Sequence, residues 1–205
     1  MAFIDRLFGR QSIPSYVVIV SGLPRSGTSM MMKMLDAAGI PPLTDNIRTP
    51  DEDNPKGYYE YERVKKLREG DFTWLHQARG KSVKVISALL PHLPPEYEYR
   101  VIFMRRLMDE ILASQRKMQV NRGEDPDKVS DEDLAQLYEK HLNETYNWLN
   151  GQKNLRWVDI SYNALLEDPV PQLAQVHQLL DGIPDVDRMR EVVDRRLYRQ
   201  RADTD

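Results

Sequence analysis

Cysteine is absent from the 205 residues of this chain. Its absence excludes a disulfide-stabilised scaffold, a thiol nucleophile and metal sites built from thiolates. Long apolar runs are also missing, since no segment approaches the ~20 consecutive apolar residues that a transmembrane helix needs. The composition, 40% hydrophobic and 30% charged, is typical of a globular protein, and the length predicts one domain over residues 1–205.

The chain lacks a strong excess of either charge. Its 29 Lys and Arg residues against 32 Asp and Glu residues give a formal net charge of −3, so we expect no nucleic-acid partner. This average hides local differences. Residues 45–53 contain four acids and one Arg, whereas residues 100–122 contain six basic and two acidic side chains. A local site for one highly charged ligand is therefore compatible with the composition.

The first ten residues, Met1–Arg10, mix charged and apolar side chains. They contain no apolar core of about 7–15 residues followed by a small-residue cleavage site, as a secretory signal would. We expect this segment to pack on its own domain, with an amphipathic helix on a membrane surface as the alternative. The expected compartment is the cytoplasm.

Short apolar segments alternate with segments of helical periodicity. The predicted strands are Tyr16–Ser21, Val83–Ser87, Arg100–Met104 and Leu155–Ile160. The predicted helices are Thr28–Ala38, Leu107–Val120, Ser130–Gly151 with a capping box of Ser130 and Asp133, Pro171–Leu180 and about 186–196. This alternation predicts an α/β fold with a central, mainly parallel sheet flanked by helices. The Pro-rich and Asp-rich segment Ile40–Gly57 predicts a long loop, and such loops are often functional.

The most informative motif is SGLPRSGTS at Ser21–Ser29, between a predicted strand and a predicted helix. Backbone N–H groups at a helix N-terminus favour anions. Gly22 and Gly27 permit tight turns and close backbone approach to a ligand, and Arg25 adds a cation with a planar donor fork. Hydroxyl donors complete the motif at Ser26, Thr28 and Ser29. The segment therefore predicts a phosphate-binding loop.

This loop lacks the lysine of the nucleotide-hydrolase P-loop, G-x-x-x-x-G-K-[ST]. Gly22 and Gly27 fit that pattern, but Thr28 stands at the lysine position. Because that lysine reaches the β and γ phosphates, its absence disfavours a nucleotide or small-molecule kinase, which we keep as an alternative. The cation of this loop is Arg25, three residues earlier.

The loop resembles that of sulfotransferases which use 3′-phosphoadenosine-5′-phosphosulfate (PAPS), with the approximate pattern Pro-[Arg/Lys]-Ser-Gly-Thr-[Thr/Ser] after an apolar strand. The resemblance implies a three-layer, P-loop-like domain that transfers a sulfuryl group without a metal and leaves adenosine 3′,5′-bisphosphate. It also implies a catalytic role for Arg25, which would neutralise the leaving phosphate. The residues implied to bind the 5′-phosphosulfate are Pro24, Arg25, Ser26, Gly27, Thr28 and Ser29.

A second motif supports the resemblance. The family has a strand that ends in Arg, followed eight residues later by a Ser on the next helix, and this pair holds the 3′-phosphate. Arg106 and Ser114 have this spacing and follow the predicted strand Arg100–Met104. Arg105 is the alternative to Arg106, because adjacent strand residues face opposite ways.

The C-terminal segment departs from the family pattern. Cytosolic members end in a Gly-rich basic segment that grips the 3′-phosphate, whereas residues 188–201 here contain six arginines. A run of charge is usually a solvated face. The alternative is that Arg199 or Arg201 completes the cofactor site.

The catalytic base has several candidates. Alignment to the family's Thr-His-Leu-Pro motif places Ala88 at the histidine, with His92 four residues later. Tyrosyl-protein and some glycan sulfotransferases instead use a Glu after the phosphate-loop helix, which makes Asp45 and Glu60 the candidate catalytic residues, with a solvated acidic loop as the alternative. The other histidines lie in helical patterns and are predicted to be structural: His76, His141 and His177.

The acceptor would be a hydroxyl or amine on a small molecule, lipid, glycan or peptide. An aromatic cluster is predicted either to line the acceptor pocket or to pack against the sheet; its members are Tyr58, Tyr59, Tyr61, Phe72 and Trp74. A P-loop-like fold that serves as a non-catalytic binding module is the second alternative.

Overall fold

The computed structural model describes residues 14–45, 47 and 57–193. The predictions for Met1–Arg10, for the middle of the acidic loop and for Arg199 and Arg201 lie outside these residues. Within the described ranges, no helix is long and apolar enough to cross a membrane.

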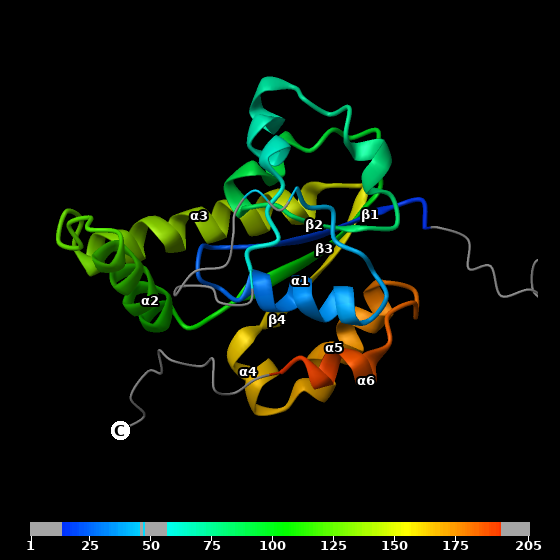
Figure 1. The fold of residues 1–205 in the computed structure, drawn as a ribbon. Coiled ribbons are helices and arrows are strands. Elements are labelled where there is room, and N and C mark those ends of the chain that lie inside the picture. The colour runs from blue at the N-terminus through cyan, green and yellow to red at the C-terminus, as the bar shows by residue number, and fades with distance from the viewer. Residues whose placement is uncertain (1–13, 46, 48–56, 194–205) are drawn as a thin grey trace, which may run out of the picture.

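The centre of the molecule is a four-stranded sheet with the strand order β2-β1-β3-β4 (Figure 1). Its strands are β1 (Val17–Gly22), β2 (Ser82–Lys84), β3 (Tyr99–Arg105) and β4 (Leu155–Ser161). Every strand pair is parallel, and Ile19 of β1 aligns with Val83 on one side and Val101 on the other. The carboxyl ends of all strands therefore lie along one edge, where open α/β sheets bind their ligands.

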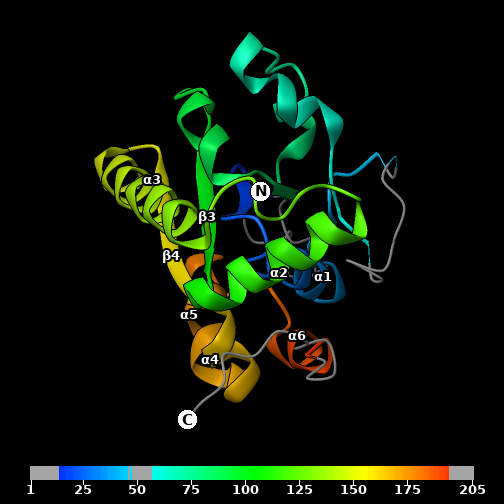
Figure 2. The same cartoon turned by 90° about the vertical axis from the view of Figure 1, so that its left-hand side faces the viewer.

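Helices cover both faces of this sheet, which confirms the predicted α/β architecture (Figure 1). One face carries α1 (Thr28–Ala37), α4 (Tyr162–Glu167), α5 (Pro169–Leu179) and α6 (Val186–Glu191). The other carries α3 (Asp131–Gly151) and the 3-10 helices η1 (Glu62–Glu69), η2 (Leu75–Ala78) and η3 (Ser87–His92). The remaining helix, α2 (Met108–Asn121), follows β3, and it projects with the first half of α3 beyond the sheet (Figures 1 and 2).

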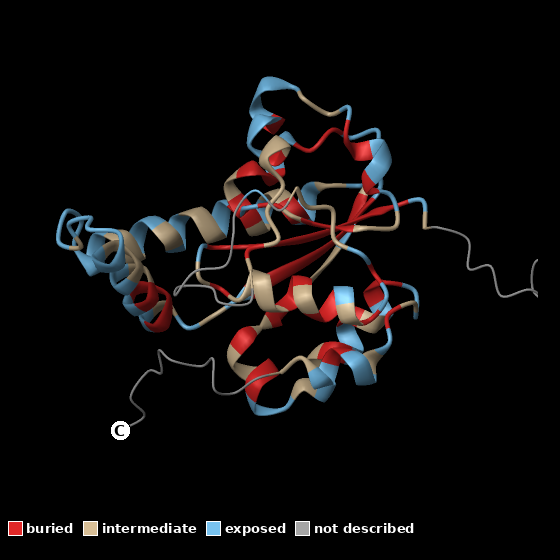
Figure 3. Ribbon diagram, in the orientation of Figure 1, coloured by how far each residue is buried: buried red, intermediate tan, exposed pale blue. Residues whose placement is uncertain are grey.

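The core consists of two apolar clusters, one on each face of the sheet (Figure 3). Strands β1, β2 and β3 are almost wholly buried between them, whereas most residues of the edge strand β4 are only partly buried. Strand β1 contributes to both clusters, because Val18 and Val20 point to the α1 face while Val17 and Ile19 point to the α3 face. A strand buried on both faces has no polar side to display. This explains why its sequence is a continuous apolar run.

The predicted strand Val83–Ser87 is shorter in the structure. β2 ends at Lys84, and Ser87 already begins η3. The 3-10 helices η1 and η2 were not predicted from the sequence. η2 has only four residues, and the eight residues of η1 bury only Val64 and Leu67 among charged neighbours. The N-cap half of the predicted capping box is confirmed, since Ser130 Oγ accepts a 3.1 Å hydrogen bond from the backbone N–H of Asp133. The Asp133 carboxylate accepts from the Ser130 hydroxyl at 2.7 Å and not from the Ser130 backbone N–H, so the reciprocal half of the box is absent.

Candidate functional site

The segment between β1 and α1 forms a tight loop at the carboxyl edge of the sheet. Its backbone is left-handed at Arg25 (φ 69°) and at Gly27 (φ 97°). Helix α1 then begins without a side-chain cap and without an acidic residue in its first turn. The first N–H groups of a helix have no intrahelical acceptor, and the helix dipole favours an anion beside them.

The two glycines of the loop allow close packing within the protein. A Cβ at Gly22 would lie 2.5 Å from both the carbonyl oxygen of Met104 on β3 and Ser26 Oγ. A Cβ at Gly27 would overlap the ring of Tyr162 at the start of α4. The close packing that these glycines allow is to β3 and to Tyr162.

The two predicted motifs meet in space. Arg25 Nε donates a 2.9 Å hydrogen bond to Ser114 Oγ on α2. Arg106, which follows β3, donates from a terminal guanidinium nitrogen to the carbonyl oxygen of Arg25 at 3.2 Å. The fold therefore brings Arg106 and Ser114, the pair with the predicted spacing, together with Arg25 of the loop.

The guanidinium of Arg106 is enclosed, and its side chain is only 8% exposed. Its Nε donates to Glu110 Oε2 at 2.7 Å, and its central carbon lies 4.8 Å from the centre of the Tyr162 ring. Asn163 Nδ2 donates to the second oxygen of Glu110 at 2.9 Å. Glu110 and Asn163 were not among the predicted site residues, although Glu110 lies one helical turn after Arg106.

Arg105 takes a different direction from Arg106. It is exposed and forms an ion pair with Asp159 of β4, with Nε 3.0 Å from Oδ2. Tyr146 of α3 also donates to Asp159, at 3.3 Å. Arg105 is the last residue of β3 and pairs across to β4, whereas Arg106, the first residue after the strand, contacts the phosphate loop.

Two hydroxyls of the loop are buried without a hydrogen-bond partner among the described residues. These are Ser21 Oγ at the end of β1 and Ser26 Oγ within the loop. Buried polar groups normally have partners, so these two hydroxyls have hydrogen-bonding capacity that the described residues do not use. Together with the uncapped start of α1 and the cation of Arg25, they fit an anionic group.

A second cation, Lys84, stands beside the loop and was missed in the sequence. Its Nζ donates to Ser29 Oγ on α1 and to the carbonyl oxygen of Tyr58, both at 3.1 Å. The signal was present, because Lys84 interrupts an apolar strand between Val83 and Val85. Lys84 thus places a second positive charge, besides Arg25, next to the first turn of α1.

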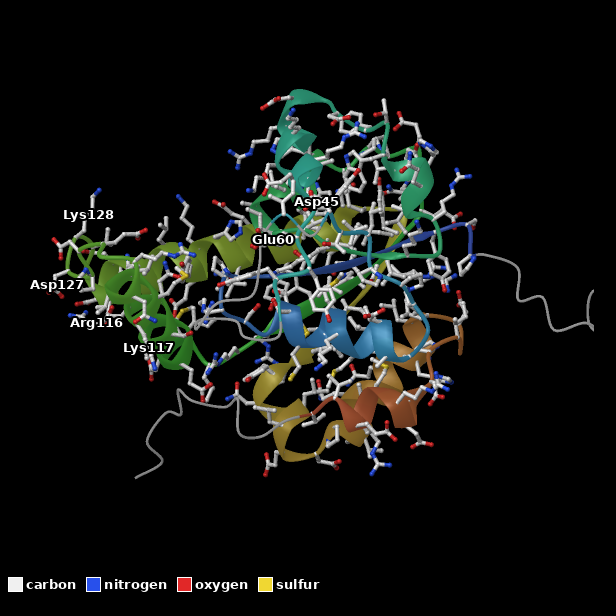
Figure 4. The ribbon with its side chains drawn as sticks, in the orientation of Figure 1. Asp45, Glu60, Arg116, Lys117, Asp127 and Lys128 are labelled. Carbon is white, nitrogen blue, oxygen red and sulfur yellow. The ribbon has the colours of Figure 1, made fainter. Side chains whose placement is uncertain are left out.

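The two candidate acids lie close to one another on segments that are hydrogen-bonded together (Figure 4). Asp45 Oδ2 accepts the backbone N–H of Glu62 at 2.7 Å, and its Oδ1 accepts the N–H of Ile47 at 3.2 Å. Asp45 thus caps the start of η1. Glu60 is half-buried, and its carbonyl oxygen accepts a 2.8 Å hydrogen bond from Thr44.

The candidate histidines differ in environment. His92 is exposed at the end of η3. His141 of α3 is half-buried, and its Nε2 lies 2.8 Å from Ser87 Oγ at the start of η3, so this pair links the two helices. Within the described part of the chain, no three His, Asp or Glu side chains gather in a way that could hold a metal ion.

The aromatic residues after the acidic loop contribute mainly to packing. Tyr58 is buried, with the Lys84 ammonium 5.9 Å from its ring centre. Tyr61 and Trp74 pack edge to face with ring centres 5.5 Å apart. Phe72 packs against the same core cluster.

No family model and no curated protein matches this sequence. Solved structures do match. The sulfotransferase domain from the curacin biosynthetic pathway superposes with a TM-score of 0.55 at 16% identity, over 89% of this chain and 79% of that domain. The sulfotransferase domain from the Synechococcus PCC 7002 olefin synthase superposes with a TM-score of 0.52 at 16% identity, over 94% of this chain and 85% of that domain. Retinol dehydratase in complex with androsterone and inactive cofactor PAP superposes with a TM-score of 0.47 at 14% sequence identity, over 90% of this chain and 65% of that chain. The chain therefore has the P-loop-like α/β fold of sulfotransferase domains.

Proposed function

We propose that this chain is a sulfotransferase that moves a sulfuryl group from PAPS to a hydroxyl or amine acceptor. The observation that carries the proposal is the meeting of the Arg25 loop with Ser114 and Arg106 at the carboxyl edge of the sheet. The shared fold of the two sulfotransferase domains supports it.

The residues around the loop fit the two anionic ends of this donor. The 5′-phosphosulfate would bind the first N–H groups of α1, the loop hydroxyls, Arg25 and Lys84, because these groups converge at the uncapped helix start. The 3′-phosphate would bind Ser114 with Arg106. Arg199 or Arg201 would supply a further positive charge to the 3′-phosphate.

The donor supplies an activated sulfur atom. The acceptor oxygen or nitrogen forms a bond to that sulfur while the bond from sulfur to the 5′-phosphate oxygen breaks, and the acceptor gives up its proton. Positioning and electrostatic stabilisation dominate transfers of this kind. Arg25 and Lys84 would stabilise the negative charge that develops on the leaving phosphate.

Glu60 is the proposed acceptor of the proton. Both oxygens of Asp45 accept backbone N–H groups, which gives that carboxylate a structural task. Glu60 lies on the adjoining segment (Figure 4). General base catalysis contributes roughly 10²–10⁴-fold to such a step.

Transfer from radiolabelled donors tests this function. The protein is incubated with sulfur-labelled PAPS and separate panels of alcohols, amines, glycans, lipid alcohols and tyrosine peptides, and in parallel with Mg²⁺ and γ-labelled ATP. We expect label to pass from PAPS to one class of acceptor. Transfer from ATP alone would establish the kinase alternative, and donor binding without transfer to any panel would support the binding module.

A further inference from the structure

A buried carboxylate is hydrogen-bonded to Arg106, the residue that contacts the phosphate loop at the Arg25 carbonyl. The Glu110 side chain is 0% exposed and accepts hydrogen bonds from Arg106 Nε at 2.7 Å and Asn163 Nδ2 at 2.9 Å. A negative charge near a site for anions opposes ligand binding by simple Coulomb repulsion. A buried carboxylate at this position therefore needs a structural role that offsets the repulsion. Its contacts with Arg106 and Asn163 indicate that role.

Arg106 donates its hydrogen bond to the backbone of Arg25, a residue with a strained conformation. Arg25 has φ 69°, a left-handed conformation that residues with a Cβ adopt at an energetic cost. Its carbonyl oxygen accepts the hydrogen bond from Arg106, and its side chain reaches Ser114 from this conformation. The hydrogen bond to the carbonyl thus favours the backbone conformation that directs the Arg25 side chain toward α2.

We propose that Glu110 is a positioning residue that holds Arg106 against the Arg25 carbonyl and so preforms the phosphate loop before any ligand arrives. Asn163 extends this arrangement to α4, since its Oδ1 accepts the N–H of Leu107 at 3.2 Å while its amide donates to Glu110. The connection runs from Asn163 through Glu110 and Arg106 to Arg25. The expected effect of this connection on ligand affinity rests on the proposed function. The order of the loop, in contrast, is a property of the protein without a ligand.

Hydrogen exchange of the unliganded protein tests this inference without any ligand. Glu110→Gln keeps the shape of the side chain but replaces one carboxylate oxygen with an N–H₂ group. In the same geometry, the amide can accept a hydrogen bond from Arg106 or from Asn163, but not from both. We expect the backbone amides of residues 22, 23 and 25–29 to exchange at least several-fold faster than in wild type. They include the N–H of Ser26, which donates to the Leu23 carbonyl. The matched control is Glu139→Gln, a change at an exposed position of α3. Unchanged exchange of the loop in folded Glu110→Gln would overturn the inference.

If Glu110→Gln does not fold, Glu110→Asp serves as the second variant, because it keeps the negative charge but shortens the side chain and so breaks the 2.7 Å contact with Arg106. Faster exchange confined to the loop and α2 is expected. Exchange equal to wild type would again overturn the proposal.

A double-mutant cycle then tests the route through Arg25, with adenosine 3′,5′-bisphosphate as the ligand. We expect Glu110→Gln to weaken binding about tenfold in wild type but by less than twofold in an Arg25→Ala background. Equal losses in both backgrounds, or tighter binding in Glu110→Gln, would overturn the role through Arg25. Absence of binding in wild type would instead contradict the proposed function and leave the exchange result as the test of loop order.

Discussion

Arg25 Nε and Ser114 Oγ are joined by a 2.9 Å hydrogen bond although 89 positions separate the two residues in the chain. One residue belongs to the loop after β1 and the other to the helix after β3, and β1 and β3 are neighbours in the sheet. A parallel sheet places the ends of neighbouring strands side by side. Two motifs that are distant in sequence thereby become one site.

Replacement of Gly27 by Ala is expected to disrupt the loop. The added Cβ would overlap the Tyr162 ring and would also hold a left-handed backbone at φ 97°. The left-handed backbone costs about 1 kcal/mol and the overlap roughly 1–3 kcal/mol more in free energy of unfolding. Gly39→Ala is the control, because Gly39 has φ 91° but no atom within 4 Å of an added Cβ. Equal losses for both variants in urea titrations would contradict the packing role of Gly27.

Replacement of Lys84 by Met is expected to weaken adenosine 3′,5′-bisphosphate binding roughly 10- to 100-fold, because a charged hydrogen-bond donor beside Ser29 is lost. Lys81→Met is the matched control, because Lys81 lies just before the opposite end of the same short strand. Isothermal titration calorimetry measures both variants. An equal affinity for Lys84→Met and wild type would remove Lys84 from the site.

The two candidate bases are expected to behave differently. Glu60→Gln should lower the transfer rate roughly 10²–10⁴-fold with an unchanged affinity for adenosine 3′,5′-bisphosphate. Asp45→Asn should lower the rate less than about tenfold and cost up to ~1 kcal/mol of stability, because it weakens the cap on η1. The measurements are single-turnover transfer from PAPS and urea unfolding. The reverse ranking of the two rates would assign the base to Asp45.

Alkaline pH is expected to destabilise the protein in part through Tyr146. Burial, followed by the nearby charge of Asp159, raises the pKa of Tyr146 from 10.0 to about 12. Between these values the unfolded chain loses a proton that the folded chain keeps, so stability falls as the pH rises from about 10 to about 12. In Tyr146→Phe the free energy of unfolding should fall less steeply between pH 9 and 11. Parallel slopes for the two proteins would contradict this account.

The positions of the main strands and helices could be predicted because buried parallel strands and amphipathic helices leave strong local patterns. The boundaries of β1, α1 and β3 each lie within one residue of their predicted positions. The 3-10 helices could not be predicted, since segments such as η2, four residues long, have no repeating face.

The site was predicted only where chemistry is concentrated in one segment. The Arg25 loop and the Arg106 and Ser114 spacing are local patterns, so they were visible in the sequence. Lys84 and Glu110 gain their importance from neighbours on other elements, and single-sequence spacing does not contain that information. Asp45 shows the opposite case, because its hydrogen bonds to backbone N–H groups give this candidate base a structural task that the sequence does not reveal.

The central claim is that the Arg25 loop binds the two-phosphate nucleotide of a sulfuryl donor. Calorimetric titration with adenosine 3′,5′-bisphosphate tests it most directly, with Arg25→Ala compared against Arg188→Ala, a control at an exposed arginine of α6. We predict saturable binding in wild type and in Arg188→Ala, and a roughly 10- to 100-fold weaker affinity in Arg25→Ala. No measurable binding in wild type, or an affinity unchanged by Arg25→Ala, would contradict the account.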